Sequence, residues 1–302
     1  MRPSGSITAL ATPFTAEGAL DFRVLRELIE NQVTAGTTGL VVAGSTGEAA
    51  TLEESEYEAL LAAAVDAAAG RIDVIAGTGL SGTAKTIAQT RRAATLGVRA
   101  ALVVTPPYVR PTQAGLVAHY RAVADEGRLP VVLYNVPGRT GVDLLPETVA
   151  ALVDHPAIIG LKEARGDDAR WRGLQPLASP SFALLSGDDP SFVMAMRHGA
   201  TGVVSVASNL VPATFARIVL DAAAGRRVEA EARDALLAPL YDFLGAAPNP
   251  IPLKAVLKAL GFGADLRLPL LPLESLLAQR LDAMLALVAR AEADAFTTRH
   301  AV

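Results

Sequence analysis

Two stretches of the sequence, PVVLYNVP at residues 130–137 and IIGLKEA at residues 158–164, have a pattern from which the fold can be predicted. Each is a nearly continuous apolar run of strand length, which is typical of strands covered on both faces. The segment between them carries helical periodicity, so it can return the chain to the same edge of a sheet. The two stretches therefore predict a β-strand, a helix and a second, parallel β-strand.

Six further runs have the same character, with helical segments between them. They are GSITALATPF (5–14), GLVVAGST (39–46), RIDVIAGTG (71–79), AALVVTPPY (100–108), FALLSGDD (182–189) and GVVSVAS (202–208). Eight strands that alternate with helices fit a (β/α)₈ TIM barrel better than an open doubly wound sheet. The remainder of the chain is helical. We therefore predict an α/β fold, with a (β/α)₈ barrel as the catalytic domain at residues 1–227 and a C-terminal helical domain at residues 228–302.

Capping residues predict where two of the helices begin and end. Thr51 and Glu54 form the pattern of a capping box, and Gly70 stands where that helix should end. Asp188 resembles a helix cap, with Pro190 in the first turn.

Composition excludes several classes of function. The 302 residues carry a net charge of −4 without long blocks of like charge, so we expect neither nucleic acid nor a membrane as a partner. Cysteine is absent, which removes disulfides, thiolate zinc sites and cysteine nucleophiles. The four histidines (His119, His155, His198 and His300) are scattered, so no metal site is expected. Without a signal-peptide pattern or a membrane-length apolar run, the sequence predicts a cytoplasmic protein that binds a small molecule.

One lysine stands out because the chain has 23 arginines and only four lysines. Lys162 ends the apolar run at 158–164, where strand alternation predicts one face with Ile158, Gly160, Lys162 and Ala164 and the other with Ile159, Leu161 and Glu163. If the first face points to the barrel axis, Gly160 leaves room beside a desolvated lysine. Desolvation favours the neutral amine that adds to carbonyl groups. The alternative is a lysine with its stem packed and its amine in solvent.

Other reactive residues follow neighbouring strands, where the active sites of such barrels form. Tyr134 is a candidate to move protons, although it could be an ordinary core tyrosine. Ser45 and Thr46 lie between glycines and could bind a carboxylate or relay protons, or they could belong to a plain turn. Tyr108 adds a phenol. Arg139 could clamp a carboxylate, or it could be a solvated loop residue.

A glycine pattern at residues 77–82, GTGLSG, fits the dinucleotide-binding fingerprint between a strand and a helix. The next strand, AALVVTPP, carries no acidic residue to hold a ribose. A nicotinamide-dependent oxidoreductase is therefore a weak alternative.

A set of motifs, in order along the chain, resembles the pyruvate-dependent class I lyase family typified by dihydrodipicolinate synthase and N-acetylneuraminate lyase. The motifs are GSTGEAATL, AGTG, TPPYVRPTQAGL, LYNVPGRTGVDLLPET, IIGLKEA, LLSGDD, GVVSV and PNPIPLKAVLKALG. The arginine in YNVPGRTG is similar to the dihydrodipicolinate synthase branch of the family.

The resemblance implies a role for each candidate residue. Lys162 would form a Schiff base with pyruvate and Tyr134 would transfer protons. Ser45 and Tyr108 would complete a hydroxyl relay, with Tyr108 supplied across a dimer interface. Thr46 and the backbone at Val204 would hold the pyruvate carboxylate, and Arg139 would bind the carboxylate of aspartate semialdehyde.

The resemblance also implies the reaction and the assembly. The product would be 4-hydroxy-tetrahydrodipicolinate, a precursor in lysine and diaminopimelate biosynthesis, and the assembly a homotetramer built as a dimer of dimers. No metal or organic cofactor would be needed, because the protonated imine is itself the electron sink. Two alternatives stay open: another aldolase of the family that acts on a sugar acid or other aldehyde, and a non-enzymatic barrel that senses a small molecule.

The sequence departs from the family pattern at three places. Ser45 replaces a threonine, and the run Pro107, Tyr108, Val109 replaces Tyr-Tyr-Asn. The positions that bind lysine in inhibited members read Glu54, Tyr57, Ser81, Lys85 and Pro107. Because Lys85 stands in place of an acid that would bind the ammonium group, we predict weak or absent inhibition by lysine.

Overall fold

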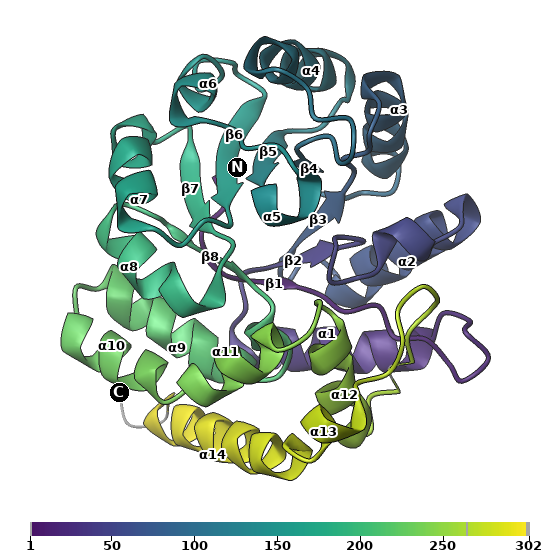
Figure 1. The fold of residues 1–302 in the computed structure, drawn as a ribbon, viewed down its shortest axis with the longest axis vertical. Coiled ribbons are helices and arrows are strands. Elements are labelled where there is room, and N and C mark those ends of the chain that lie inside the picture. The colour runs from purple at the N-terminus through teal and green to yellow at the C-terminus, as the bar shows by residue number, and fades with distance from the viewer. Residues whose placement is uncertain (1, 264, 300–302) are drawn as a thin grey trace.

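The computed structural model describes residues 2–263 and 265–299 and contains a closed barrel of eight parallel strands (Figure 1). Each strand pairs with the next, and β1 pairs with β8 to close the barrel. The strands are β1 (Gly5–Ala9), β2 (Gly39–Val42), β3 (Asp73–Gly77), β4 (Ala100–Val104), β5 (Val131–Asn135), β6 (Ile158–Glu163), β7 (Ala183–Ser186) and β8 (Gly202–Ser205). All eight predicted strands and the barrel are confirmed.

Helices form a ring outside the strands, as the view along the barrel in Figure 1 shows. Those that connect successive strands are α1 (Phe22–Ala35), α2 (Glu54–Ala68), α3 (Thr83–Ala94), α4 (Gln113–Glu126), α5 (Pro137–Thr140), α6 (Pro146–Ala150), α7 (Asp168–Leu174) and α8 (Phe192–Arg197). Four short 3₁₀ helices cover Ala49–Thr51, Gln175–Leu177, Asp189–Ser191 and Ala207–Asn209. The ring covers the outer face of the strands, which explains their nearly continuous apolar sequences.

Two hydrophobic cores result from this arrangement. The larger core lies between the strands and the helices and includes residues such as Leu40, Leu133 and Trp171. The smaller core fills the barrel interior with alternate residues of the strands, such as Ile75, Leu185 and Val204. The barrel interior is therefore filled with side chains, and the candidate site residues lie at the carboxyl end of this packed core.

The helix after β8 and five more helices complete the chain. They are α9 (Pro212–Ala223), α10 (Arg227–Ala235), α11 (Ala238–Gly245), α12 (Ile251–Ala259), α13 (Ser275–Ala278) and α14 (Leu281–Arg299). Glu292 of α14 accepts hydrogen bonds from the backbone N–H groups of Ala213 and Thr214 at 3.2 and 2.9 Å. This carboxylate therefore caps the start of α9 and fixes α14 against it.

One predicted helix cap is wrong by two residues. Thr51 ends a 3₁₀ turn instead, and its hydroxyl donates to the carbonyl oxygen of Glu48 at 2.9 Å. The cap of α2 is Glu53, whose backbone N–H donates to the Glu56 carboxylate at 3.0 Å. Gly70 follows the end of α2 with a left-handed φ of 70°, as predicted. Asp188 precedes a 3₁₀ turn with Pro190 in it, and α8 begins only at Phe192.

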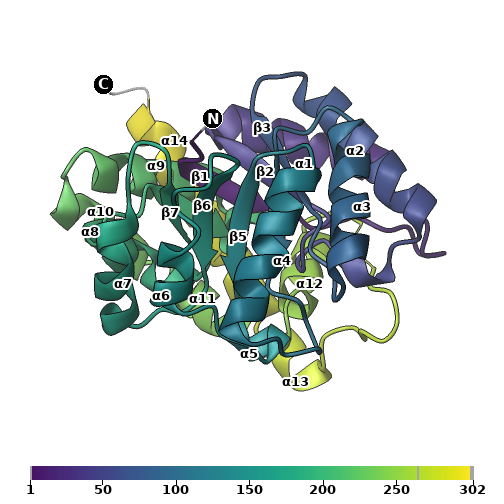
Figure 2. The same ribbon diagram turned by 90° about the horizontal axis from the view of Figure 1, so that it is seen from above.

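The predicted C-terminal segment at 228–302 extends over residues 264 and 300–302, which lie outside the described part of the chain, as does His300. Among the described helices, none is long and apolar enough to cross a membrane. Figure 2 shows α5 and α13 at one edge of the molecule, on the side where β5 ends.

Candidate active site

The carboxyl ends of β5 and β6 bring Tyr134 and Lys162 together. The two residues are register partners in the parallel pair, so their side chains lie side by side inside the barrel. Both are buried, Lys162 to 5% exposure and Tyr134 to 8%. The Lys162 Nζ lies 4.3 Å from the centroid of the Tyr134 ring. The alternative of a lysine with its amine in solvent is thereby excluded, because the amine lies against an aromatic ring inside the barrel.

The predicted alternation of β6 holds only for its second half. Lys162 and Ala164 face the barrel interior, and Leu161 lies in the outer core, as predicted. Ile158 and Ile159 are reversed, since Ile158 packs in the outer core and Ile159 in the interior. The cause is a register shift between β5 and β6: Val131 pairs with Ile158 but Val132 with Gly160. A bulge of this kind inserts one residue and reverses the alternation before it.

The glycine that makes room for the lysine is Gly187, and the prediction of Gly160 is wrong. A Cβ atom on Gly187 would lie 2.7 Å from Lys162 Cε and 3.0 Å from its Cγ. A Cβ atom on Gly160 would instead lie 2.7 Å from the backbone oxygen of Ala183. Gly160 thus allows β6 and β7 to approach, whereas Gly187, just after β7, leaves the space that the lysine stem fills.

Three predicted binding residues lie in or after other elements of the barrel. Val204 of β8 is buried in the barrel interior. Thr46 is buried in the loop after β2, and its hydroxyl accepts a hydrogen bond from Asn249 Nδ2 at 3.0 Å. Arg139 is exposed in α5, and its Nη2 donates to the Asn249 carbonyl oxygen at 3.0 Å.

Asn249 is a site residue that the sequence reasoning missed. It connects Thr46, in the loop after β2, with Arg139, in α5 after β5, and it lies two residues before α12 begins. Asn249 stands in the family motif PNPIP, whose prolines indicate a break between helices, but the motif does not show which residues the Asn249 amide contacts. One residue near the C-terminal helices therefore ties together the two predicted carboxylate-binding side chains.

The remaining predicted residues, Ser45 and Tyr108, are both exposed in the single chain. Tyr108 is 92% exposed and has a left-handed φ of 73°, which is uncommon for a tyrosine. Within the described part of one chain, no hydrogen bond connects either residue to Tyr134. The single chain thus brings Lys162 and Tyr134 together but does not by itself assemble the hydroxyl relay.

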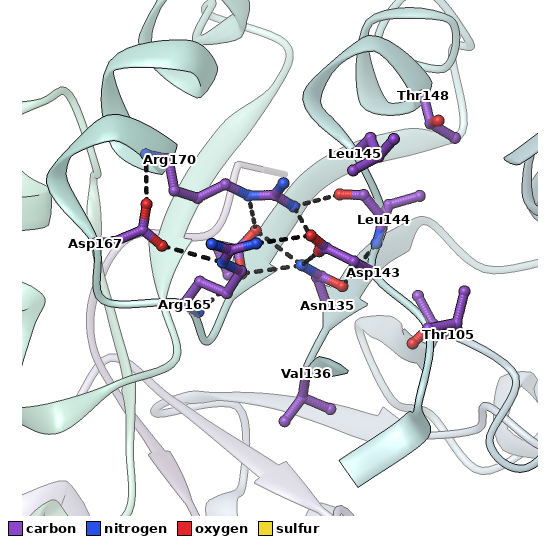
Figure 3. Close-up of polar contacts among 12 residues, drawn as sticks. Thr105, Asn135, Val136, Asp143, Leu144, Leu145, Thr148, Arg165, Asp167 and Arg170 are labelled. Atoms are coloured by element: carbon purple, nitrogen blue, oxygen red, sulfur yellow. Dashed lines mark hydrogen bonds and ion pairs between the residues drawn. The ribbon is translucent and has the colours of Figure 1, made fainter. Parts of the chain in front are cut away.

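A polar network joins the ends of β5 and β6 on the outer face of the barrel (Figure 3). Glu163, next to Lys162, accepts from Arg170 Nε at 2.7 Å and from Asn135 Nδ2 at 3.1 Å. Arg170 also bonds to Asp143 at 3.2 Å, and Asn135 bonds to the same carboxylate at 2.7 Å. Burial raises the pKa of Glu163, while Arg170 opposes that shift.

This network fixes the backbone on which the two central side chains stand. Asn135 follows Tyr134 and Glu163 follows Lys162, so the network joins the ends of β5 and β6 on their outer side. The Arg165 guanidinium contributes a contact to Asp143 at 2.8 Å, and Asp167 caps α7 by accepting from the backbone N–H of Arg170. Motion of either strand end would break several buried hydrogen bonds.

Comparison with known proteins now defines the family. The model of the dihydrodipicolinate synthetase family matches residues 2–287. The chain is 61% identical over 275 residues to the 4-hydroxy-tetrahydrodipicolinate synthase of Stenotrophomonas maltophilia, covering 91% of this chain and 93% of the relative. The chain belongs to the dihydrodipicolinate synthetase family.

Solved structures of this family share the whole barrel. The chloride-inhibited dihydrodipicolinate synthase of Acinetobacter baumannii, crystallised with pyruvate, has a TM-score of 0.92 at 39% identity, covering 95% of this chain and 99% of that one. A monomeric dihydrodipicolinate synthase variant has a TM-score of 0.92 at 37% identity, covering 95% and 97%. Membership of the dihydrodipicolinate synthetase family agrees with the resemblance in the motifs. It does not support the alternative of a nicotinamide-dependent oxidoreductase, which rested on the glycine pattern at residues 77–82.

Proposed function

We propose that this chain condenses pyruvate with L-aspartate 4-semialdehyde to 4-hydroxy-tetrahydrodipicolinate through a Schiff base on Lys162. The 4-hydroxy-tetrahydrodipicolinate synthases to which it is similar support the reaction. The observation that carries the chemistry is the buried Lys162 amine at the end of β6, 4.3 Å from the Tyr134 ring centroid. As a step of amino-acid biosynthesis, the reaction is proposed to take place in the cytoplasm.

The first half of the proposed reaction forms a nucleophile from pyruvate. The neutral Lys162 amine adds to the ketone carbon, and the carbinolamine loses water to give a protonated imine. Tyr134 passes a proton to the departing hydroxyl group and regains one from solvent through Ser45 and Tyr108. The pyruvate methyl group then gives up a proton, which passes through the hydroxyl relay to solvent, and the electrons of the broken C–H bond form the enamine as the imine nitrogen becomes neutral.

The second half joins the acceptor. The enamine carbon attacks the aldehyde carbon of aspartate semialdehyde, whose oxygen takes up a proton. The substrate amine next attacks the imine carbon, closes the ring and displaces the Lys162 nitrogen, which leaves as the free amine. In this scheme Thr46 and the backbone at Val204 hold the pyruvate carboxylate, and Arg139 holds the carboxylate of the acceptor.

The proposal includes a partner subunit that supplies Tyr108. The 92% exposure of this tyrosine supports the proposal, because its side chain is open to a neighbouring subunit. We propose a homotetramer built from two dimers, in which each dimer completes two sites. Sedimentation that shows a fully active monomer would refute the cross-subunit relay.

An assay of three acceptors tests the function. Purified protein is incubated with pyruvate and either aspartate semialdehyde, N-acetylmannosamine or glyceraldehyde, and consumption of each substrate is followed. The proposal predicts turnover with aspartate semialdehyde at a far higher kcat/KM than with either sugar. Turnover of a sugar without consumption of aspartate semialdehyde would assign the chain to another aldolase, and no turnover at all would favour a sensing barrel.

A further inference from the structure

A buried ion pair outside the catalytic centre joins the loop that carries Thr46 to the C-terminal helices. Glu48 lies two residues after Thr46, and its carboxylate pairs with the Nζ of Lys254 on α12. The side chains are 1% and 0% exposed, respectively. The proposed mechanism uses neither group, although Lys254 is one of only four lysines in the chain.

The loop at residues 43–48 has an unfavourable backbone conformation that contacts with other segments must stabilise. Ala43 and Glu48, at its two ends, both have a left-handed φ of 53°, a conformation that residues other than glycine seldom adopt. Such positions persist only where surrounding contacts determine them. Residues 43–48 therefore need bracing from outside.

Hydrogen bonds from three other segments of the chain stabilise this loop. Thr12 Oγ1 donates to the Gly47 carbonyl oxygen at 2.7 Å. Asn249, five residues before Lys254 and just ahead of α12, donates to the Thr46 hydroxyl. On its other side, the Glu48 carboxylate accepts from the backbone N–H of Arg267 at 3.1 Å. The segment that runs from Asn249 into α12 thus contacts the loop twice, at Thr46 and at Glu48.

Lys254 is itself held in place by its surroundings. Its Nζ donates to the Asp265 carbonyl oxygen at 2.9 Å and lies 4.2 Å from the centroid of the Phe14 ring. The Arg267 guanidinium lies 4.1 Å from the same ring. A buried ammonium with two oxygen partners and an aromatic face is a rigid anchor, because any displacement leaves a charge unpaired in an apolar region.

From this geometry we infer that Glu48 and Lys254 form a positioning pair that fixes the Thr46 loop and thereby sets the affinity of the enzyme for pyruvate. This inference rests on the proposed function, in which Thr46 holds the pyruvate carboxylate. The pyruvate carboxylate is captured in the first half-reaction, before the acceptor binds, so the pair contributes to the capture of pyruvate. It does not contribute to the capture of the acceptor, which involves a separate half-reaction and Arg139.

The test is a steady-state comparison of the two half-reactions in the full-length protein. In a reaction that passes through a covalent pyruvate intermediate, kcat/KM for pyruvate and kcat/KM for the acceptor report on separate steps. Lys254→Met keeps the length of the side chain and removes its charge. The variant is expected to lower kcat/KM for pyruvate about tenfold while kcat/KM for aspartate semialdehyde changes less than about twofold.

Two further variants show whether the effect of Lys254→Met comes from the loss of the ion pair. Lys258→Met is the matched control, since Lys258 lies one turn further along α12 in an exposed pair with Asp265. It is expected to keep both constants within about twofold of the wild-type values. The double variant Glu48→Gln, Lys254→Met has no unpaired buried charge, yet it still lacks the tether. It should show the same selective loss as Lys254→Met alone.

The outcomes separate the inference from the proposed function. An inactive wild-type protein would refute the proposed function. An active wild-type protein, with both Lys254 variants folded and within about twofold in kcat/KM for pyruvate, would refute the positioning pair. Equal losses for both substrates, or failure of both variants to fold, would also refute it, because the pair would then support the whole fold and not the loop.

Discussion

The space beside the central lysine provides the most direct prediction from the geometry, the effect of Gly187→Ala. The new Cβ atom would lie 2.7 Å from Lys162 Cε and 3.0 Å from its Cγ, whereas carbon atoms normally approach to about 3.5–4.0 Å. The lysine stem must therefore move by about 1 Å from Cγ outward. A displacement of this size at a reacting group lowers catalysis by about a hundredfold.

The loss is expected in chemistry more than in stability. The stem of a lysine can rotate away from the new methyl group, so unfolding free energy should fall by only about 1–3 kcal/mol, the usual range for overpacking. The amine, however, would leave its place over the Tyr134 ring. The assay measures kcat/KM for pyruvate together with urea unfolding of the same preparation.

Two other glycines serve as controls. Gly245→Ala adds a methyl group that meets nothing within 4 Å, so activity should not change, and stability should stay the same or rise by up to about 1 kcal/mol because alanine favours the helix. In Gly160→Ala, the methyl group would lie 2.7 Å from the rigid backbone oxygen of Ala183, so the pairing of β6 with β7, and hence stability, should be reduced. A Gly187→Ala protein that retains kcat/KM within about twofold of wild type would refute the assignment of Gly187 as the residue that makes room for Lys162.

Three further outcomes are expected. Arg170→Leu leaves the Glu163 carboxylate buried without its cation, so urea unfolding should show a loss of about 3–5 kcal/mol, and a loss below about 1 kcal/mol would contradict the network. Burial raises the pKa of Asp189 from 3.8 to about 6, so the folded state binds more protons in that interval. The unfolding free energy should therefore fall as pH rises through this interval. Urea titrations at several pH values should show a smaller fall for Asp189→Asn than for the wild type. An equal fall in both proteins would contradict the raised pKa of Asp189. Because Lys85 repels an ammonium group, half-inhibition by free lysine should need more than about 1 mM at saturating pyruvate, and a lower value would contradict the reasoning.

The sequence predicts the barrel well because the strand pattern is local. Each of the eight apolar runs is read from its own residues, and the closed barrel then follows from the regular alternation with helices. The proximity of Lys162 and Tyr134 could also be predicted, since both stand near the ends of such runs and parallel strands place those ends together. The family membership was carried by short motifs at those same strand ends.

The details that the sequence did not predict depend on contacts between distant segments. The bulge that reverses Ile158 and Ile159 is a property of the pairing between β5 and β6. The role of Gly187 depends on where β7 lies relative to Lys162, which no local pattern contains. Asn249 reaches Thr46 across more than two thirds of the chain, and the cap of α2 moved to Glu53 because a 3₁₀ turn occupies Ala49–Thr51.

Reductive trapping shows whether the Lys162 amine forms the imine with pyruvate. The protein is incubated with pyruvate and sodium borohydride, digested, and its lysine-containing peptides are analysed by mass spectrometry. Four lysines are present, and Lys254 is a buried internal comparison. We predict a reduced pyruvate adduct on Lys162 alone, lost in Lys162→Ala. No adduct, or an adduct on Lys254 in place of Lys162, would contradict the account.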